Sequence, residues 1–270
     1  MTDTFLAHYA DIHDSSHHAH INRQLRDHGL ATFGGIRDRA TLLTAARPLL
    51  TVRPHRDAGP DGITVITSRA DASTPGYAAF ATTGLSPHTD GTSLPAPPHL
   101  VMLACLVPGT DGGESYLTDG SRVFSTLAEH DPEALGALAA PRSAFFGTAD
   151  GYLGSVFEDA GGGRVSVRLR TDELARFSPD ITRILPRLRA TIDQHKVSLR
   201  LRPGEGYLLD NSRWLHGRRR FTGERVMIRI LGDPLPETAI YPGFTPWTTP
   251  HDQEDQAREF RSYAEQQAIM

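Results

Sequence analysis

The amino-acid sequence predicts a mainly β protein, an antiparallel barrel or sandwich with helices packed on the outside. Segments with the apolar or alternating pattern of short strands outnumber the long helical segments. The helical segments lie before and between blocks of strands, and they do not alternate with single strands. A doubly wound parallel sheet is therefore not expected, because that fold needs a regular βα alternation.

Length and composition indicate one globular domain. We expect a single domain over residues 1–270, because barrels and sandwiches often reach this length undivided. The hydrophobic share of 39% and the charged share of 22% are typical of soluble globular proteins. A net charge of −4 argues against sequence-independent binding of nucleic acid, which needs a basic face.

The sequence also indicates where in the cell the protein is expected. The N-terminal residues lack the pattern of a signal peptide, and no apolar run is long enough to span a bilayer. Cys105 is the only cysteine and lies in an apolar run, so we expect it to be buried and unpaired. A cytoplasmic protein without a membrane partner is the natural expectation.

The first half of the chain predicts two helices and several strands. Gly29 is the expected end of the first helix, because glycine readily adopts the left-handed conformation that ends helices. An irregular to extended stretch at 75–90 leads into a loop rich in proline and glycine at 91–98. The helices are expected at 16–28 and 39–46, and the strands at 30–33, 62–67 and 100–107.

The second half begins with a short strand at 115–118. Asp131-Pro132 should interrupt the next helix, at 122–139, because proline cannot continue the hydrogen-bond pattern. Two strands lie on either side of the glycine turn at 161–163, the second at 165–170. The remaining elements are a helix at 179–195, strands at 197–201, 206–210 and 225–231, and a peripheral helical tail from His251.

A metal site is the first chemical prediction. On an extended segment His88 and Asp90 point to the same side, so imidazole and carboxylate can converge on one ion. His216 follows an apolar strand and a polar turn, and it could supply the third ligand. A set of two histidines and one carboxylate leaves positions open on iron(II) for a chelating cosubstrate and O2. Without further context, the better interpretation of His216 is a hydrogen-bonded structural histidine at a strand end.

An arginine pair strengthens this interpretation. Arg225 and Arg229 are four residues apart on a predicted strand, so both side chains share one face, opposite Val226 and Ile228. Two guanidinium groups that face the interior of a barrel are costly unless each meets an anion. A dicarboxylate cosubstrate would supply such an anion.

At this point the sequence resembles the taurine dioxygenase and clavaminate synthase-like family of iron(II)/2-oxoglutarate oxygenases. The resemblance covers residues 29–234 and rests on motifs in a fixed order. These are Leu85-Ser86-Pro87-His88-Thr89-Asp90, Pro97-Pro98, Gly112-Gly113-Glu114-Ser115, His216-Gly217-Arg218, and the Arg225/Arg229 pair before Ile230-Leu231-Gly232-Asp233.

The resemblance implies a fold and a set of site residues. The fold is a double-stranded β-helix, a distorted jelly roll of the cupin type. His88, Asp90 and His216 would hold Fe(II), while Ser115 and Arg225 would bind the distal carboxylate of 2-oxoglutarate.

The resemblance also bears on the substrate. Gly84 stands where the taurine enzyme has an asparagine that helps bind sulfonate, so taurine is not the expected substrate. Arg229 would meet an acidic group on the substrate, or support Arg225 or Asp90. We expect hydroxylation of a small acidic molecule, an amino acid or a related biosynthetic intermediate.

Other residues could also face the substrate. Arg168, with Arg170 and Asp172, could project from one strand face into the cavity, or that face could be exposed. The loop at 91–98 and the segment at 77–83 are positioned to close over the substrate. Asp90 makes halogenation unlikely, because halogenating relatives need a small residue there. Desaturation, epoxidation and ring closure stay open.

Two alternatives from other classes are a zinc hydrolase that uses the same three ligands and a non-catalytic barrel that binds a small acid. Neither explains the Gly-Gly-Glu-Ser block together with Arg225. Two further clusters are expected to have no function. The histidines near Asp14 (His17, His18 and His20) should lie on an exposed helix, and the run 218–220 should be a solvated loop.

Overall fold

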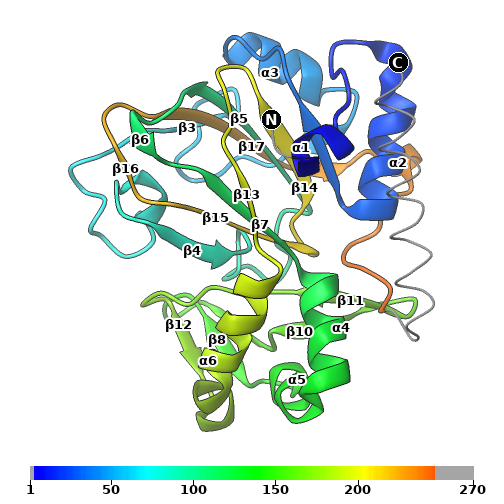
Figure 1. Ribbon diagram of the computed structural model, residues 1–270, viewed down its shortest axis with the longest axis vertical. Coiled ribbons are helices and arrows are strands. Elements are labelled where there is room, and N and C mark those ends of the chain that lie inside the picture. Colours follow the sequence, from blue (N-terminus) through cyan, green and yellow to red (C-terminus); the bar gives the residue numbers. More distant parts are fainter. Residues whose placement is uncertain (1–2, 247–270) are drawn as a thin grey trace.

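The computed structural model describes residues 3–246, which form mainly antiparallel sheets with helices around them (Figure 1). The mainly β class predicted from the sequence is confirmed. The largest sheet has the order β1-β14-β5-β17-β2, and β3 also pairs with β17. Its strands are β1 (Leu30–Phe33), β2 (Leu50–Val52), β3 (Thr64–Ile66), β5 (Leu100–Val107), β14 (Gly206–Asp210) and β17 (Val226–Pro234).

A second sheet of four strands has the order β13-β7-β15-β4. Its strands are β13 (Val197–Leu199), β7 (Ser115–Asp119), β15 (Trp214–Arg218) and β4 (Leu85–His88). Three smaller sheets complete the β structure. They are β6 (Asp111–Gly112) with β16 (Phe221–Thr222), β10 (Phe157–Gly161) with β11 (Arg164–Val167), and β8 (Ala144–Phe146) between β9 (Tyr152–Gly154) and β12 (Ala175–Phe177).

Strand β5 shows how the alternating pattern builds the layers. Its even-numbered residues 100–104 pack in one core with the helices α2 (His18–His28) and α3 (Arg39–Ala46). Its odd-numbered residues Val101, Leu103 and Cys105 pack in another core with Leu117 and Trp214 of the second sheet. Successive side chains of a strand point to opposite faces, so one buried strand serves both cores. The predicted burial of Cys105 is confirmed.

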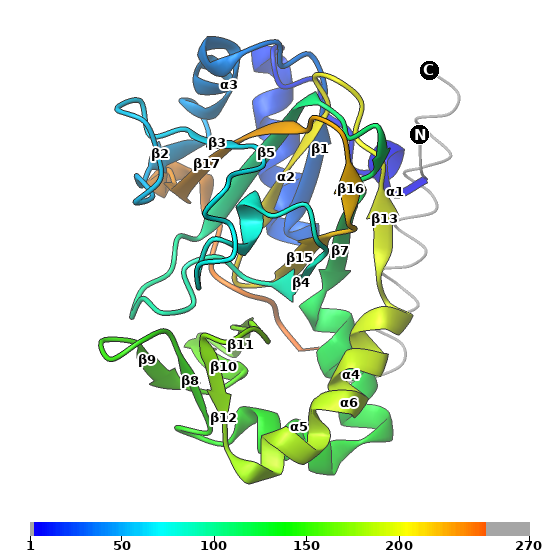
Figure 2. The same cartoon turned by 90° about the vertical axis from the view of Figure 1, so that its left-hand side faces the viewer.

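The helices lie in two groups, as Figure 2 shows. Helices α2 and α3 lie beside the six-stranded sheet, and Gly29 ends α2 in the left-handed conformation with φ of 66°. The second group and the small sheets β8–β12 form the lower part of the view. This second group of helices consists of α4 (Gly120–His130), α5 (Pro132–Ala139) and α6 (Pro179–Gln194). The remaining helical segments are α1 (Asp3–Ala7), η1 (Ser15–His17), η2 (Ala78–Phe80) and η3 (Pro236–Thr238).

Some boundaries differ from those predicted. The strand expected at 165–170 ends at Val167, because the next residues bond to other segments. The backbone N–H of Arg168 donates to the carbonyl oxygen of Val156, and the carbonyl oxygen of Leu169 accepts from the N–H of Thr89. The whole of β15 was missed, and His216 lies within this strand instead of after a turn. The tail from His251 lies outside the described residues. Among residues 3–246, no helix is long and apolar enough to cross a membrane.

Candidate active site

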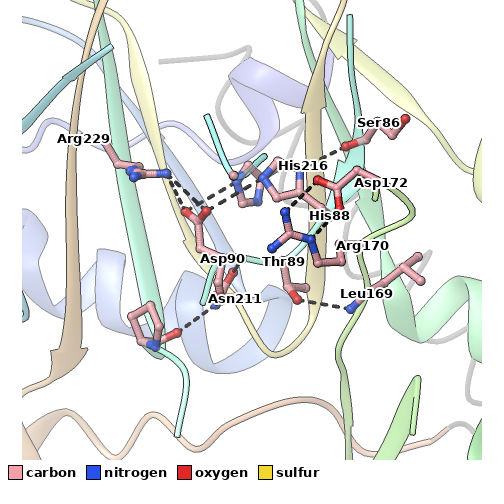
Figure 3. A network of polar contacts seen from close by, with 12 residues as sticks. Ser86, His88, Thr89, Asp90, Leu169, Arg170, Asp172, Asn211, His216 and Arg229 are labelled. Carbon is pink, nitrogen blue, oxygen red and sulfur yellow. Dashed lines mark hydrogen bonds and ion pairs between the residues drawn. The ribbon is translucent and has the colours of Figure 1, made fainter. Parts of the chain in front are cut away.

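Strands β4 and β15, with the turn after β4, bring His88, Asp90 and His216 together. His88 and His216 are directly paired across the two strands, and their ring centroids are 4.4 Å apart. The Nε2 atoms of His88 and His216 lie 3.8 and 3.7 Å from the two carboxylate oxygens of Asp90 (Figure 3). One ligand atom from each residue lies within 4.8 Å of the other two. The three side chains therefore converge on one point, as the sequence predicted.

Gly217 explains how β4 comes close enough to β15. A methyl group at this position would lie 2.6 Å from the carbonyl oxygen of Leu85 and 3.1 Å from the nitrogen of Pro87. Any larger residue would push β4 away from β15 and would separate His88 from His216. The glycine after the distal histidine is thus part of the geometry of the site.

The histidines are suited to donate to a metal. Burial lowers the pKa of His88, and burial together with the neighbouring His88 lowers the pKa of His216 to about 3. Both rings are therefore neutral at physiological pH and keep a free lone pair. Nδ1 of His88 lies 2.9 Å from the carbonyl oxygen of Ser86, so it carries the proton and leaves Nε2 free to coordinate.

Asp90 is held as a carboxylate in a defined position. Nη1 of Arg229 donates to both carboxylate oxygens at 3.1 Å. Burial alone would raise the pKa of Asp90, but Arg229, His216 and His88 hold it well below its usual range. The backbone is held by Asn211: Oδ1 accepts from the N–H of Asp90 at 2.7 Å, and Nδ2 donates to its carbonyl oxygen at 2.9 Å.

The three residues open onto a cavity of about 660 Å³. The cavity is lined by the odd-numbered residues of β17, namely Met227, Arg229 and Leu231, and by the adjacent Arg225. The prediction that Arg225 and Arg229 share an inward face is confirmed, since Ile228 packs in the helix-covered core on the other side of the sheet. Residues from both expected covering segments, 78–80 and 91–94, also line the cavity.

Ser115 and Arg225 lie in this cavity together, as the sequence predicted. Ser115 is buried, and Tyr207, a residue that sequence reasoning missed, lines the same cavity. Gly113 makes room for the arginine, because a methyl group there would lie 3.2 Å from Cδ of Arg225, and its φ of +82° suits glycine. Hydroxyl and guanidinium groups in one buried place are complementary to a carboxylate.

Arg168 and Arg170 point to different places. Arg168 does not line the cavity: its guanidinium donates to the carbonyl oxygens of Thr92 and Leu94 at 2.8 and 2.6 Å and stacks on Tyr152. Arg170 does line the cavity, in a bidentate ion pair with Asp172 at 2.7 and 2.6 Å. The prediction of one shared face fails because the strand ends before these residues.

Arg218 corrects another expectation. The run at 218–220 was expected to be a solvated loop, but Arg218 is the last residue of β15 and is only 4% exposed. Arg219 and Arg220 are exposed as expected. Burial, with the nearby Arg225, lowers the pKa of Arg218 to about 10. Its position two residues after His216 on a strand is the signal that would have placed it in the cavity.

The remaining candidate cluster does not form a site. Asp14 accepts hydrogen bonds from Ser16, and the neighbouring His17 is exposed. Within the described part of the chain, His88, Asp90 and His216 form the one group of three residues that could hold a metal ion. His55 was missed by sequence reasoning. It lines the same cavity near Asp90 and Arg229, on a loop without a recognisable motif.

The chain is similar to several known proteins. Residues 4–231 match the family described as taurine catabolism dioxygenase TauD, TfdA family. Uridine-5'-phosphate dioxygenase from Streptomyces sp is 27% identical over 202 residues, 68% of this chain and 73% of that protein. Human gamma-butyrobetaine dioxygenase is 29% identical over 171 residues, 57% of this chain and 44% of that protein. The chain thus spans less than half of the human relative.

Solved structures share the fold. An asparagine oxygenase in complex with Fe(II), 2S,3S-3-hydroxyasparagine and succinate aligns with a TM-score of 0.61 at 18% identity, over 80% of this chain and 78% of that one. PvcB from Pseudomonas aeruginosa aligns with a TM-score of 0.61 at 18% identity, over 83% of this chain and 82% of that one. Because the family match covers most of the chain in addition, this protein belongs to the TauD/TfdA family of dioxygenases.

Proposed function

We propose that this protein is an iron(II)- and 2-oxoglutarate-dependent dioxygenase that hydroxylates an unactivated C–H bond of a small acidic molecule. The observation that carries the proposal is the convergence of His88, Asp90 and His216 within 4.8 Å in a member of this family. Two neutral imidazoles and one carboxylate are the donor set that non-haem iron(II) oxygenases use. The fold that fits this function is a double-stranded β-helix, in one domain over residues 1–270.

Iron(II) with 2-oxoglutarate and O2 supplies the oxidising power, in a reaction that releases succinate and CO2. The protein's part is to bind and to orient. His88, Asp90 and His216 would hold the metal, with the proton of His88 kept on Nδ1 by the carbonyl of Ser86. Arg229 would keep Asp90 ionised and aligned. Ser115 and Arg225 would bind the distal carboxylate of 2-oxoglutarate.

The substrate would enter on the side of Arg170 and Asp172. This ion pair and His88 line the same cavity. A guanidinium and a carboxylate side by side suit a zwitterion such as an amino acid. Similar proteins act on small charged molecules, as the names uridine-5'-phosphate dioxygenase, gamma-butyrobetaine dioxygenase and asparagine oxygenase state.

Other roles proposed from the sequence take a modified form. Arg229 would act on the substrate indirectly, since its guanidinium is committed to Asp90. Arg168 would act through the loop at 92–95, which it holds by its carbonyl groups. A cytoplasmic location stays a prediction that rests on the single buried cysteine.

Anaerobic addition of iron(II) and 2-oxoglutarate tests the proposal. A dioxygenase should show the weak visible charge-transfer band of a chelated 2-oxo acid, whereas a zinc hydrolase or a non-catalytic binding barrel should show none. His88→Ala, Asp90→Ala and His216→Ala should each remove the band and succinate formation while the circular dichroism spectrum is unchanged. His130→Ala, on an exposed helix end, is the matched control. Near wild-type succinate formation in any of the three would remove that residue from the proposed ligand set.

A further inference from the structure

Arg218 is a buried cation that the proposed function does not yet use. It lies on β15 two residues after His216 and lines the same cavity. Nη2 donates to the carbonyl oxygen of Ala81 at 2.7 Å. Nη1 is buried and has no hydrogen-bond partner. A buried guanidinium with an unused donor is costly, so this position calls for an acceptor that the described residues do not provide.

Arg218 and Arg225 share a neighbour, the ring of Phe221. Arg218 is paired across the strands β15 and β7 with Ser115. The guanidinium carbons of Arg218 and Arg225 lie 4.7 and 5.5 Å from the centre of the same Phe221 ring. Two guanidinium groups that contact the same ring are of like charge, and an anion bound by both would offset their repulsion.

The other arginines of the cavity differ from these two. Each of the others has a carboxylate partner: Arg229 has Asp90, Arg170 has Asp172, Arg56 has Asp57 and Arg53 has Asp233. Over residues 3–246, neither Arg218 nor Arg225 forms an ion pair with a carboxylate. A ligand with a negative charge would balance the two guanidinium groups.

We propose that Arg218 and Arg225 together form a two-guanidinium seat, closed by Ser115, for the distal carboxylate of the 2-oxo acid cosubstrate. This inference rests on the proposed function and extends it, because it makes Arg218 a residue that selects dicarboxylates over 2-oxo monocarboxylates. The substrate suits this position less well than the cosubstrate does. The Arg170–Asp172 pair, which would face the substrate, shares no hydrogen bond with Arg218. A carboxylate has two oxygens, and a guanidinium on each side can satisfy both.

Binding of two 2-oxo acids tests the seat. Both 2-oxoglutarate and 2-oxopentanoate have the same chelating end and chain length, but only 2-oxoglutarate has a distal carboxylate. Each is titrated by calorimetry onto the protein loaded with Mn(II), so that no turnover is needed. In Arg218→Met, 2-oxoglutarate binding should weaken about tenfold or more, while 2-oxopentanoate binding stays unchanged. Arg218→Lys should recover part of the loss, because it restores charge without the planar fork.

Arg219→Met is the matched control, since Arg219 is the exposed neighbour. The double variant Arg218→Met/Arg225→Met should lose less affinity than the sum of the single losses, because the two residues would share one ligand group. Equal weakening of both acids in Arg218→Met, or unchanged 2-oxoglutarate binding, would overturn the seat. If Arg218→Met does not fold, Arg218→Lys decides: an unchanged preference for 2-oxoglutarate overturns the inference. A wild-type protein that binds neither acid overturns the proposed function as well, whereas one that binds both equally overturns only the seat.

Discussion

The side-chain amide of Asn211 hydrogen-bonds both backbone polar groups of Asp90, although the two residues are 121 positions apart. The same amide donates to the carbonyl oxygen of Pro98 at 2.9 Å. Asn211 therefore joins the turn before β15, the segment of Asp90 and the end of the loop at 91–98. Asn211 touches none of the three proposed ligand atoms, so it would be a positioning residue.

Replacing Asn211 should loosen the metal site without removing a ligand. In Asn211→Ala the backbone N–H of Asp90 loses its acceptor, and the carboxylate can shift away from the two imidazoles. We expect iron(II) affinity to fall by about tenfold to a hundredfold, the usual effect of losing a supporting contact behind a ligand. Ser212→Ala, next in the chain, is the control. Metal titration that gives the same affinity in both variants would show that Asn211 has no positioning role.

Arg225 and Arg229 should affect different ligands in a pair of titrations. Arg225→Ala should raise the apparent 2-oxoglutarate constant by about thirty-fold or more, since truncating one partner of a buried charged pair costs about 2–5 kcal/mol. Arg225→Lys should restore only part of the affinity. Measuring succinate formation against 2-oxoglutarate concentration gives the constants.

Arg229→Ala should mainly affect iron(II) binding. The variant removes both hydrogen bonds to Asp90, so iron(II) affinity and the coupling of succinate to product should fall more than 2-oxoglutarate affinity. Parallel titrations of metal and 2-oxoglutarate make the comparison. A loss of 2-oxoglutarate affinity as large as that in Arg225→Ala would contradict this division of roles.

Arg168 should control the loop over the cavity. Its guanidinium donates to three carbonyl oxygens at residues 92–95. Arg168→Met keeps most of the stem but releases these carbonyls, so amide hydrogen exchange in the loop should become faster and the substrate constant should rise. The 2-oxoglutarate constant should stay unchanged. The control is Arg176→Met, which changes an exposed arginine on β12. Equal exchange rates in the two variants would show that Arg168 does not hold the loop at 92–95.

The buried His8 and the half-buried His28 should make the protein sensitive to mild acid. Burial lowers the pKa of each from 6.5 to about 4, and Arg213 adds to this effect. Because the pKa of each histidine is lower in the folded state, the unfolded state binds protons at a higher pH than the folded state does. Stability is therefore complete above pH 6.5 and is lost as the pH falls from 6.5 towards 4, by about 1.4 kcal/mol per unit for each histidine.

Urea unfolding at a series of pH values measures this loss. His8→Gln removes one titrating group and should reduce the slope of unfolding free energy against pH between 6.5 and 4. His13→Gln, at an exposed position, should leave the slope unchanged. The same slope in His8→Gln and wild type would show that His8 does not contribute to the acid sensitivity.

Local patterns in the sequence determined much of this protein. The apolar run of β5, the glycine that ends α2 and the proline that begins α5 act over a few residues, so these elements could be predicted from the sequence. The motif around His88 and Asp90 and the inward face of Arg225 and Arg229 follow from the two-residue period of extended chain, which needs no knowledge of the fold.

The tertiary structure decided which inward-facing groups meet. Arg218 is buried because β15 lies between β7 and β4, and the local sequence does not reveal this strand pairing. Arg168 turns to the loop at 92–95 because the strand ends at Val167 and the strand period no longer holds. Asn211 reaches Asp90 because strand pairing joins segments more than a hundred residues apart. Such contacts form between residues that are far apart in the sequence, so local sequence patterns do not predict them.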